Sequence, residues 1–419
     1  MPENEIFDRS TATDDVSGIV SDIIADVRKN GDAALIAYAE KFDGAVLEKV
    51  EVTEDETDEA FASVGSEFLG VLEKAAANIR AFHGRQVRNG FMMTGDGIVM
   101  GQKVTPIEKI GIYVPGGTAA YPSTVLMDAI PAKLAGCPLI CMMTPPSSDG
   151  RVPSAILAAA KIAGVDRIFK TGGAQAVAAL AYGTETVPAV DKIVGPGNIF
   201  VAEAKRQVFG RVAIDMIAGP SEILVIADAK SNPEYVAADL LSQAEHDKNA
   251  SAVLVTDSAE FAGAVRTELE RQLALLPREK IARASIEANG KIIVADSVDD
   301  VIGVANRIAP EHLELCVDNP FDYLDRIRNA GSIFMGRYCP EALGDYFAGP
   351  NHTLPTSGTA RFSSPLSVDD FVKKSQYTYY TKDALAMAAA DVAFFASKEG
   401  LDAHARSVTV RIEKNEQIS

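Results

Sequence analysis

The sequence predicts an α/β protein with two units of parallel β-sheet. Short apolar segments alternate with helical segments across Gly/Pro-rich turns, as is typical of right-handed crossovers between parallel strands. The chain has 419 residues, which is too long for one ordinary core, so two or three domains are expected. A hydrophobic content of 47% with 23% charged residues is typical of globular proteins.

The elements follow in order along the chain. The first hundred residues read mostly helical, because apolar residues recur there at three- and four-residue steps. The first series of expected strands is 109–117, 138–144, 167–173 and 192–198. The second series is 221–228, 251–257, 291–296, 312–317 and 328–336. The tail from Ser367 reads largely helical and ends in an alternating, strand-like "SVTVRI".

Charge and composition exclude several classes of protein. The formal net charge of −18 at pH 7 opposes non-specific binding to nucleic acid or to an anionic membrane. The apolar runs are shorter than the roughly 20 residues that a spanning helix needs, and the acidic N-terminus does not resemble a signal peptide. The four cysteines form no C-x-x-C pair, so we expect buried free thiols and a cytoplasmic location.

Three Gly-rich turns follow expected strands, at 114–119, 171–176 and 195–200. Such turns let a phosphate approach the backbone at the N-terminus of a helix. None is a full G-x-G-x-x-G, and the strand at 138–144 runs into "TPPSS" without the acid that would hold a ribose hydroxyl. A dinucleotide site would depart from the usual fingerprint, and turn chemistry alone is the alternative.

The segment "LSQAEHDKNA" places Gln243 and His246 within one helical turn, in a chain with five histidines. Asn232 and the proline after it suit the start of a helix, and an apolar stripe lies beside a sector that holds Asp239, Gln243 and His246. Two ligands one turn apart can converge on one ion. The alternative for Gln243 and His246 is a solvated polar flank of the helix. For Asp239 a solvated flank is our expectation, and a role in supporting the metal ligands is the alternative.

The other histidines provide further candidates. Glu311 and His312 adjoin before a strand and suit general acid/base chemistry, although a polar turn is the alternative. His352 lies in a Gly/Pro-rich loop with Asp345 seven residues before it, and His404 follows Glu399 near the C-terminus. Carboxylate, imidazole and amide ligands without cysteine fit zinc. Spacing leaves open whether these residues meet in space. 

At these residues the chain closely resembles the histidinol dehydrogenase family. The match is a collinear set of motifs from roughly Gly111 to Arg411, with a weaker resemblance in the N-terminal hundred residues. The motifs include "GIYVPGG", "YPSTVLM", "GGAQA", "GPGN", "AGPSE", "SQAEH", "PEHLEL", "GDYFAGPNHTLPT", "GTARFSSPLSV" and the "AH" before "SVTVR".

The resemblance implies a role for individual residues. The implied catalytic acid/base pair is Glu311 and His312. The implied zinc ligands are Gln243, His246, Asp345 and His404. The implied substrate contacts are Ser221, His352 and Glu399, together with Gln243, His246, His312, Asp345 and His404. The implied NAD contacts are Tyr113, Gln175 and Asn198, one in or beside each Gly-rich turn.

The resemblance also implies an architecture of two incomplete Rossmann-like domains with small terminal extensions. The expected parts are an N-terminal arm (1–14), a first domain with the metal and acid/base residues (15–112 and 221–366), a second domain on the NAD side (113–220) and a C-terminal dimerisation segment (367–419). An intertwined homodimer is expected, in which His404 belongs to the zinc site of the partner subunit.

The implied activity is the zinc- and NAD-dependent oxidation of L-histidinol through an aldehyde to L-histidine. His312 would take the alcohol proton, and Glu311 would activate the water that hydrates the aldehyde. Three alternatives remain: a dehydrogenase of the same fold for another polar alcohol such as a sulfopropanediol, an aldehyde dehydrogenase that uses Cys339, and a non-catalytic zinc-binding protein. Paired Glu311 and His312 favour an enzyme.

Overall fold

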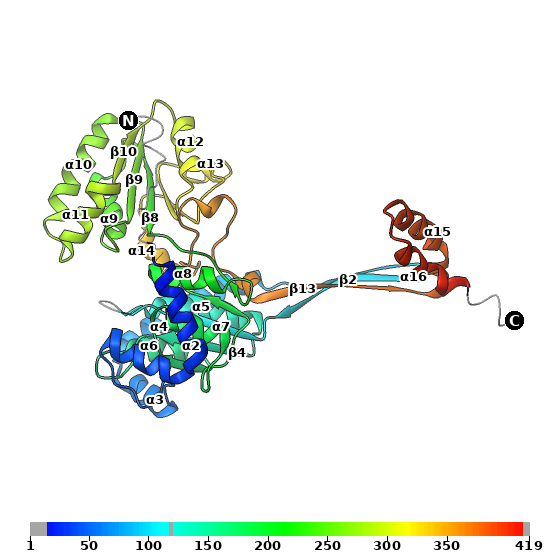
Figure 1. The fold of residues 1–419 in the computed structure, drawn as a ribbon. Helices are drawn as coiled ribbons and strands as arrows, with labels where there is room; N and C mark the ends of the chain where they lie inside the picture. The colour runs from blue at the N-terminus through cyan, green and yellow to red at the C-terminus, as the bar shows by residue number, and fades with distance from the viewer. Residues whose placement is uncertain (1–14, 117–119, 414–419) are drawn as a thin grey trace. The chain divides into compact units, whose positions relative to one another are not determined.

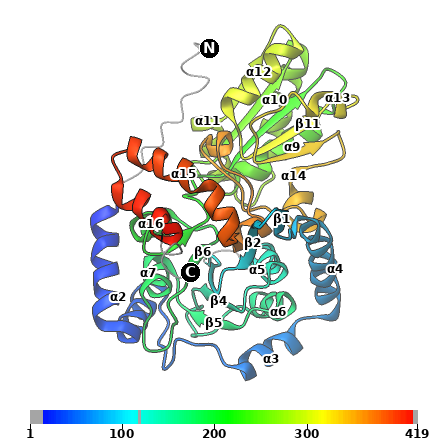
Figure 2. The ribbon, with the colours of Figure 1, turned by 90° about the vertical axis from the view of Figure 1, so that its right-hand side faces the viewer.

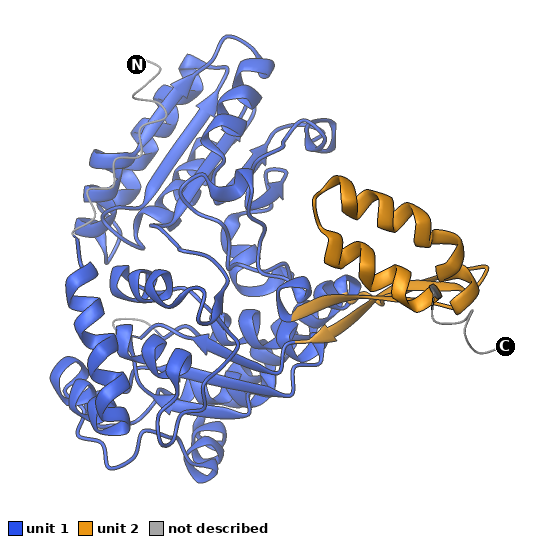
Figure 3. Ribbon diagram, turned by 45° about the vertical axis from the view of Figure 1, so that its right-hand side comes forward, with its two compact units in different colours: residues 1–86, 107–371 blue, residues 87–106, 372–419 orange. Residues whose placement is uncertain are grey.

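The computed structural model describes residues 15–116 and 120–413, so the expected N-terminal arm lies outside the described residues. These residues form two compact units, residues 1–86 with 107–371 and residues 87–106 with 372–419 (Figure 3). Unit 1 contains two five-stranded sheets in which every strand pair is parallel (Figure 1). The predicted pair of parallel α/β sheets is therefore confirmed.

The first sheet has the strand order β5-β4-β3-β6-β7. Its strands are β3 (Lys109–Tyr113), β4 (Leu139–Thr144), β5 (Arg167–Lys170), β6 (Lys192–Val194) and β7 (Ala213–Ile214). The strands pack on both faces because alternate side chains enter different cores: Ile140 and Met142 belong to one core, Cys141 and Met143 to the other.

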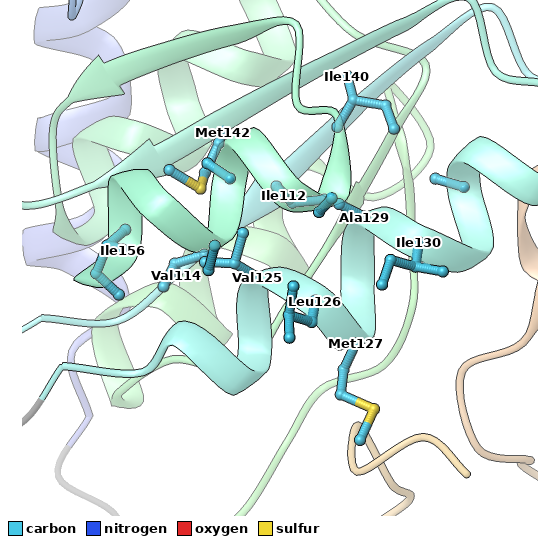
Figure 4. Close-up of a cluster of buried hydrophobic side chains, with 14 of the residues drawn as sticks. Ile112, Val114, Val125, Leu126, Met127, Ala129, Ile130, Ile140, Met142 and Ile156 are labelled. Atoms are coloured by element: carbon cyan, nitrogen blue, oxygen red, sulfur yellow. The ribbon is translucent and has the colours of Figure 1, made fainter. Parts of the chain in front are cut away.

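Helices cover both faces of the first sheet. One face carries α2 (Ser17–Tyr38), α7 (Gly173–Tyr182) and α8 (Ile199–Val208) (Figure 2). The other carries α3 (Glu54–Ser63), α4 (Ser66–His83), α5 (Pro122–Ala135) and α6 (Ser154–Ala163). Figure 4 shows the core on this second face, where Ile112, Met142 and Ile156 lie near Val125 and Leu126.

These contacts correct the expected domain boundaries. The expected first domain joins residues 15–112 to residues 221–366, but α2, α3 and α4 share their buried cores with the first sheet, whose strands lie between residues 109 and 214. The physical reason is their apolar stripes, such as Val20, Ile24 and Val27 on α2, which are buried against α7 and α8.

The second sheet has the order β10-β9-β8-β11-β12. Its strands are β8 (Glu222–Ala227), β9 (Ser251–Thr256), β10 (Lys291–Val294), β11 (His312–Cys316) and β12 (Ser332–Met335). Its helices are α9 (Pro233–Ala244), α10 (Ala259–Leu273), α11 (Glu279–Asn289), α12 (Val298–Ile308) and α13 (Phe321–Leu324). Short α14 (Glu341–Leu343) leads into a π-helix (Gly344–Ala348) and a loop that ends near residue 358.

Unit 2 contains an antiparallel sheet of order β1-β2-β13 and two helices that pack on each other. Its elements are β1 (Phe91–Gly95), β2 (Ile98–Pro106), β13 (Val372–Tyr380), α15 (Lys382–Lys398) and α16 (Asp402–Glu413). The expected terminal strand in "SVTVRI" is wrong, because packing against α15 holds this β-branched segment in α16. None of the described helices combines the length and apolarity needed to cross a membrane.

Candidate active site

The candidate acid/base pair lies at the amino end of β11. Ala309 ends α12 in the left-handed conformation (φ 50°), which is uncommon for a residue other than glycine, and Pro310 prevents the helix from continuing. Glu311 and His312 follow directly and are 7% and 4% exposed. This turn therefore buries two ionisable side chains next to each other, at the opposite end of the sheet from the usual ligand position.

Backbone groups of β8 hold both side chains. The amide of Glu222 donates a hydrogen bond to Glu311 Oε2 (2.8 Å), and His312 Nδ1 lies 3.0 Å from the carbonyl oxygen of Glu222. Ser221, an expected substrate contact, directly precedes Glu222, the first residue of β8. The expected substrate residue and the acid/base pair therefore meet at the amino ends of two neighbouring strands.

Two carboxyl groups face the free nitrogen of His312. His312 Nε2 lies 3.8 Å from Asp345 Oδ1 and 4.0 Å from Glu341 Oε1, and it makes no hydrogen bond to any described residue. Ligand atoms of His312, Glu341 and Asp345 all lie within 4.8 Å of one another. This separation leaves room between the three groups for a bound atom.

The charges of this cluster shift its pKa values. Burial raises the pKa of Glu311 to about 8 and that of Glu341 to about 7. Burial alone would lower the pKa of His312, but Glu311, Asp345 and Glu341 outweigh it and raise this pKa to about 10. Burial alone would raise the pKa of Asp345, but His312 and His352 hold it well below its usual range.

Gln243 and His246 approach the cluster from α9. The helix ends at Ala244, so His246 is not on it as expected; it lies in the following turn, where its amide donates to the Gln243 carbonyl oxygen (3.1 Å). Gln243 is 1% exposed, and neither polar atom of its side chain has a hydrogen-bond partner among the described residues. His246 is exposed in the single chain but lies close enough to interact electrostatically with Asp345 and His312.

His352 completes this side of the site. Its Nδ1 lies 3.1 Å from the carbonyl oxygen of Asp345, and its Nε2 lies 3.4 Å from Thr124 Oγ1 at the start of α5. Burial lowers the pKa of His352 more than Asp345 raises it, which favours the neutral ring. Sequence analysis did not single out Thr124, although this residue lies in the motif "YPSTVLM".

Two expected site residues belong to unit 2. Glu399 caps the C-terminus of α15, and His404 lies in the first turn of α16. Neither is a member of the cluster around His312. The structure therefore brings together Ser221, Gln243, His246, Glu311, His312, Asp345 and His352, all from unit 1.

Glu341 is a site residue that sequence analysis missed. It is 3% exposed, faces His312, and accepts a hydrogen bond from Ser242 Oγ (3.0 Å). Its own amide donates to Glu314 Oε1 (2.7 Å). A glutamate in "CPEALGDY" has no ligand spacing, so only its position in "PEALGD", four residues before Asp345, could have drawn attention to it.

Asp239 is not on a solvated flank as we expected. Its carboxyl group pairs with that of Glu314, which is 1% exposed. One polar atom each of Asp239, Glu314 and Cys316 lies within 4.8 Å of the other two. Burial raises the pKa of Glu314 to about 9 and that of Asp239 to about 6. Asp239 therefore supports Glu314, whose carboxyl group accepts a hydrogen bond from the backbone amide of Glu341.

The chemistry of these groups fits a metal ion. Zinc prefers nitrogen and oxygen donors from imidazole, carboxylate and amide groups. The buried side-chain amide of Gln243 has no hydrogen-bond partner among the described residues, and buried polar groups normally have one. An ion bound by Gln243, His246 and Asp345 would satisfy that amide and would offset the negative charge of the carboxyl cluster.

The three expected NAD contacts lie at the carboxyl edge of the first sheet. Tyr113 ends β3, and its hydroxyl oxygen accepts a hydrogen bond from the amide of Gly173 (3.0 Å). Gln175 lies in the first turn of α7 and is 3% exposed. Asn198 caps α8, with its Oδ1 accepting from the amides of Phe200 and Val201.

A cavity of about 370 Å³ opens at the same edge, beyond β3 and β4. Pro115 and Gly116 line it after β3, and Thr144 and Pro145 line it after β4. A Cβ at Gly116 or Gly172 would collide with Pro145, at 2.2 and 2.7 Å. These glycines therefore allow close backbone approach, which is the arrangement that suits a nucleotide.

Known proteins resemble the chain along nearly all of its length. Residues 7–412 match the histidinol dehydrogenase family. Histidinol dehydrogenase from Streptococcus mutans is 57% identical over 402 residues (96% of this chain and 94% of that protein), and the enzyme from Geobacillus kaustophilus is 56% identical over 407 residues (97% and 96%). The crystal structure of histidinol dehydrogenase from Elizabethkingia anophelis superposes with a TM-score of 0.94 at 42% identity, covering 100% of this chain and 98% of that one. From this agreement in both sequence and fold, the chain belongs to the histidinol dehydrogenase family, whose members are oxidoreductases.

Proposed function

We propose that this protein oxidises L-histidinol through histidinal to L-histidine, the last step of histidine biosynthesis, with NAD as oxidant and zinc as resident metal. The observation that carries the proposal is the buried Glu311–His312 pair, whose free nitrogen faces Asp345 beside the unpartnered amide of Gln243. A binding or scaffold protein has no need of such a pair.

In this proposal the zinc ligands are Gln243, His246 and Asp345, with His404 as the fourth. A zinc ion there would supply positive charge that binds and orients the polar substrate. The pKa of about 10 for His312 belongs to the metal-free chain. A cation bound by Asp345 would offset one of the carboxylates that raise this pKa. The pKa of His312 would then fall, and more of the ring would be in the neutral form that can accept a proton near neutral pH.

His312 and Glu311 would divide the proton transfers. In the alcohol oxidation, His312 Nε2 would take the hydroxyl proton as the hydride leaves carbon. In the second oxidation, Glu311 would take a proton from the water that adds to the aldehyde, and the resulting diol would lose the second hydride. NAD, when bound, would supply the acceptor for both hydrides. Ser221 and His352 would contact the substrate around this pair.

The cofactor contacts in this proposal are Tyr113, Gln175 and Asn198. Their support is their common position at the carboxyl ends of parallel strands, where α/β folds usually bind nucleotides. Asn198 Oδ1 is engaged by the helix cap, so its Nδ2 is the group that would face the cofactor.

We also propose a homodimer in which Glu399 and His404 act in the site of the partner subunit. Two features support it: His246 is exposed in the single chain, and unit 2 carries exposed large apolar side chains, which commonly mark an interface. They include Phe91, Met92, Met93, Tyr377, Tyr379, Met387, Phe394 and Phe395. The four cysteines are free, which fits the proposed cytoplasmic location.

The test is NADH formation from L-histidinol, before and after chelation. We expect about two NADH for each histidinol, one for each hydride removed, with activity lost to a chelator and restored by zinc. No turnover of histidinol by the zinc-loaded protein would overturn the proposal. One NADH with release of the aldehyde would favour a simple alcohol dehydrogenase instead.

A further inference from the structure

An unpaired carboxyl group lines the cavity at the carboxyl ends of β3 and β4. Asp43 enters this cavity from a π-helix (Ala39–Asp43) that follows α2. It lies close enough to Tyr113 to affect the titration of that phenol electrostatically. The carboxyl group therefore lies near Tyr113, an expected NAD contact, although Asp43 comes before all the strands of the first sheet in the sequence.

The backbone around Asp43 is held firmly. Ala39, Ala45 and Leu47, which flank Asp43 in the sequence, form a small buried cluster. Gly44 takes the left-handed conformation (φ 67°), and its amide donates a hydrogen bond to the carbonyl oxygen of Ala39. Ser148, which follows β4 and lines the same cavity, lies 3.9 Å from the position of a Cβ at Gly44.

The carboxyl group of Asp43 has no hydrogen-bond partner among the described residues. Asp43 Oδ2 is buried and makes no hydrogen bond to any described residue. Burial raises the pKa of Asp43 to about 6. A buried acceptor without a donor is destabilising, so a ligand that brings donors would relieve it.

The sequence around β4 lacks the residue that nucleotide-binding folds usually place here. In those folds an acid after the second strand accepts hydrogen bonds from the ribose hydroxyls. Here β4 runs into Thr144 and Pro145, and the next acid, Asp149, is exposed and accepts from the amide of Arg151 within its own loop (3.0 Å). Asp43 reaches the corresponding end of the strand from a different segment.

We propose that the Asp43 carboxylate accepts hydrogen bonds from the hydroxyls of the adenosine ribose of NAD, and that it excludes a ribose that carries a 2′-phosphate. The hydroxyls supply the donors that the carboxylate lacks. A 2′-phosphate would remove one of them and place a second negative charge against the carboxylate. This inference rests on the proposed use of NAD.

The test measures cofactor binding directly. The fluorescence of NADH and of NADPH is titrated against the protein without substrate, for wild type, Asp43→Asn, Asp43→Ala and the control Glu40→Gln. Glu40 is an exposed acid on the same π-helix. We expect both Asp43 variants to bind NADH about tenfold more weakly or worse and to lose most of the discrimination against NADPH, with Glu40→Gln unchanged.

Thermal unfolding separates this role from a structural one. Because the carboxyl group has no partner, Asp43→Asn should unfold at the same temperature as the wild type or higher in the absence of cofactor. The ratio of NADPH to NADH affinity does not depend on the folded fraction. Wild type that binds neither cofactor would overturn the proposed use of NAD. Wild type that binds NADH, with an unchanged ratio in both Asp43 variants, would overturn the role of Asp43 alone.

Discussion

The Nδ1 atom of His312 lies 3.0 Å from the backbone carbonyl oxygen of Glu222 at the start of β8. A carbonyl oxygen only accepts, so Nδ1 must carry a hydrogen, and in the neutral ring the lone pair lies on Nε2. That nitrogen is the one that faces Asp345 and Glu341. The backbone of β8 therefore sets the tautomer that a base at this position requires.

His312→Asn should abolish the oxidation of histidinol, whereas Glu311→Gln should spare it and impair the oxidation of histidinal. Loss of a general base lowers kcat by about 10²- to 10⁴-fold. The measurement is the rate of NADH formation with each substrate supplied separately. Equal losses on both substrates for both variants would contradict the division of roles.

Glu341→Gln should weaken zinc binding by about 10- to 100-fold, the usual effect of changing a group behind the metal ligands. The carboxylate faces His312 and Asp345 and accepts from Ser242, and Glu314 accepts from the backbone amide of Glu341. Competition with a chromophoric chelator measures the affinity, and the absorption spectrum of the cobalt-substituted protein reports the ligand geometry. Glu234→Gln is the control, because Glu234 is exposed in the first turn of the same α9. Unchanged affinity and spectrum in Glu341→Gln would show that this carboxylate has no part in the metal site.

The sheets could be predicted from sequence because buried parallel strands are continuous apolar runs. In β8, the side chains of Ile223 to Ala227 alternate between two cores, and a short continuous apolar run is typical of such a strand. The antiparallel sheet of unit 2 was missed for the converse reason: β13 is exposed along almost its whole length and carries polar residues, so no burial pattern marks it.

The site residues were found from their chemistry, but their mutual arrangement was not. Asp239 pairs with Glu314, and the partner lies in a buried strand far along the chain, so spacing on α9 pointed to a solvated flank. Glu341 and Thr124 act through contacts that a π-helix and a distant loop create. Contacts of this kind depend on tertiary structure, which local periodicity does not encode.

Asp128→Asn should make the protein more stable at neutral and alkaline pH. Asp128 is fully buried, accepts from Thr353 Oγ1 (3.0 Å), and has an Oδ2 without a partner among the described residues. Burial, followed by the charge of Asp215, raises its pKa from 3.8 to about 8. Between these two values the folded protein holds a proton that the unfolded chain has lost, so stability falls as pH rises, by up to about 1.4 kcal/mol per pH unit. The asparagine stays neutral and removes this loss.

Urea unfolding across this pH range measures the effect. The free energies of unfolding of the wild type and Asp128→Asn should diverge steadily as pH rises, with the variant the more stable. Asp149→Asn is the control, because Asp149 is exposed and its curve should run parallel to the wild type. Parallel curves for Asp128→Asn would mean that the carboxyl group is already ionised in the folded protein.

Cys339→Ser should retain both oxidation steps, with kcat within about twofold of the wild type, since a surface substitution away from the reacting groups has little effect. A nucleophilic cysteine needs a nearby base or positive charge to form a thiolate. Cys339 is half-buried, and its amide donates to Gly336 in a turn, but no described residue forms a hydrogen bond with its Sγ. Cys316, the thiol nearest the acid cluster, is no better suited, because burial and Glu314 raise its pKa. The decisive measurement is histidinal oxidation by Cys339→Ser: loss of this step with histidinol oxidation intact would mean that a thiol, and not water activated by Glu311, attacks the aldehyde.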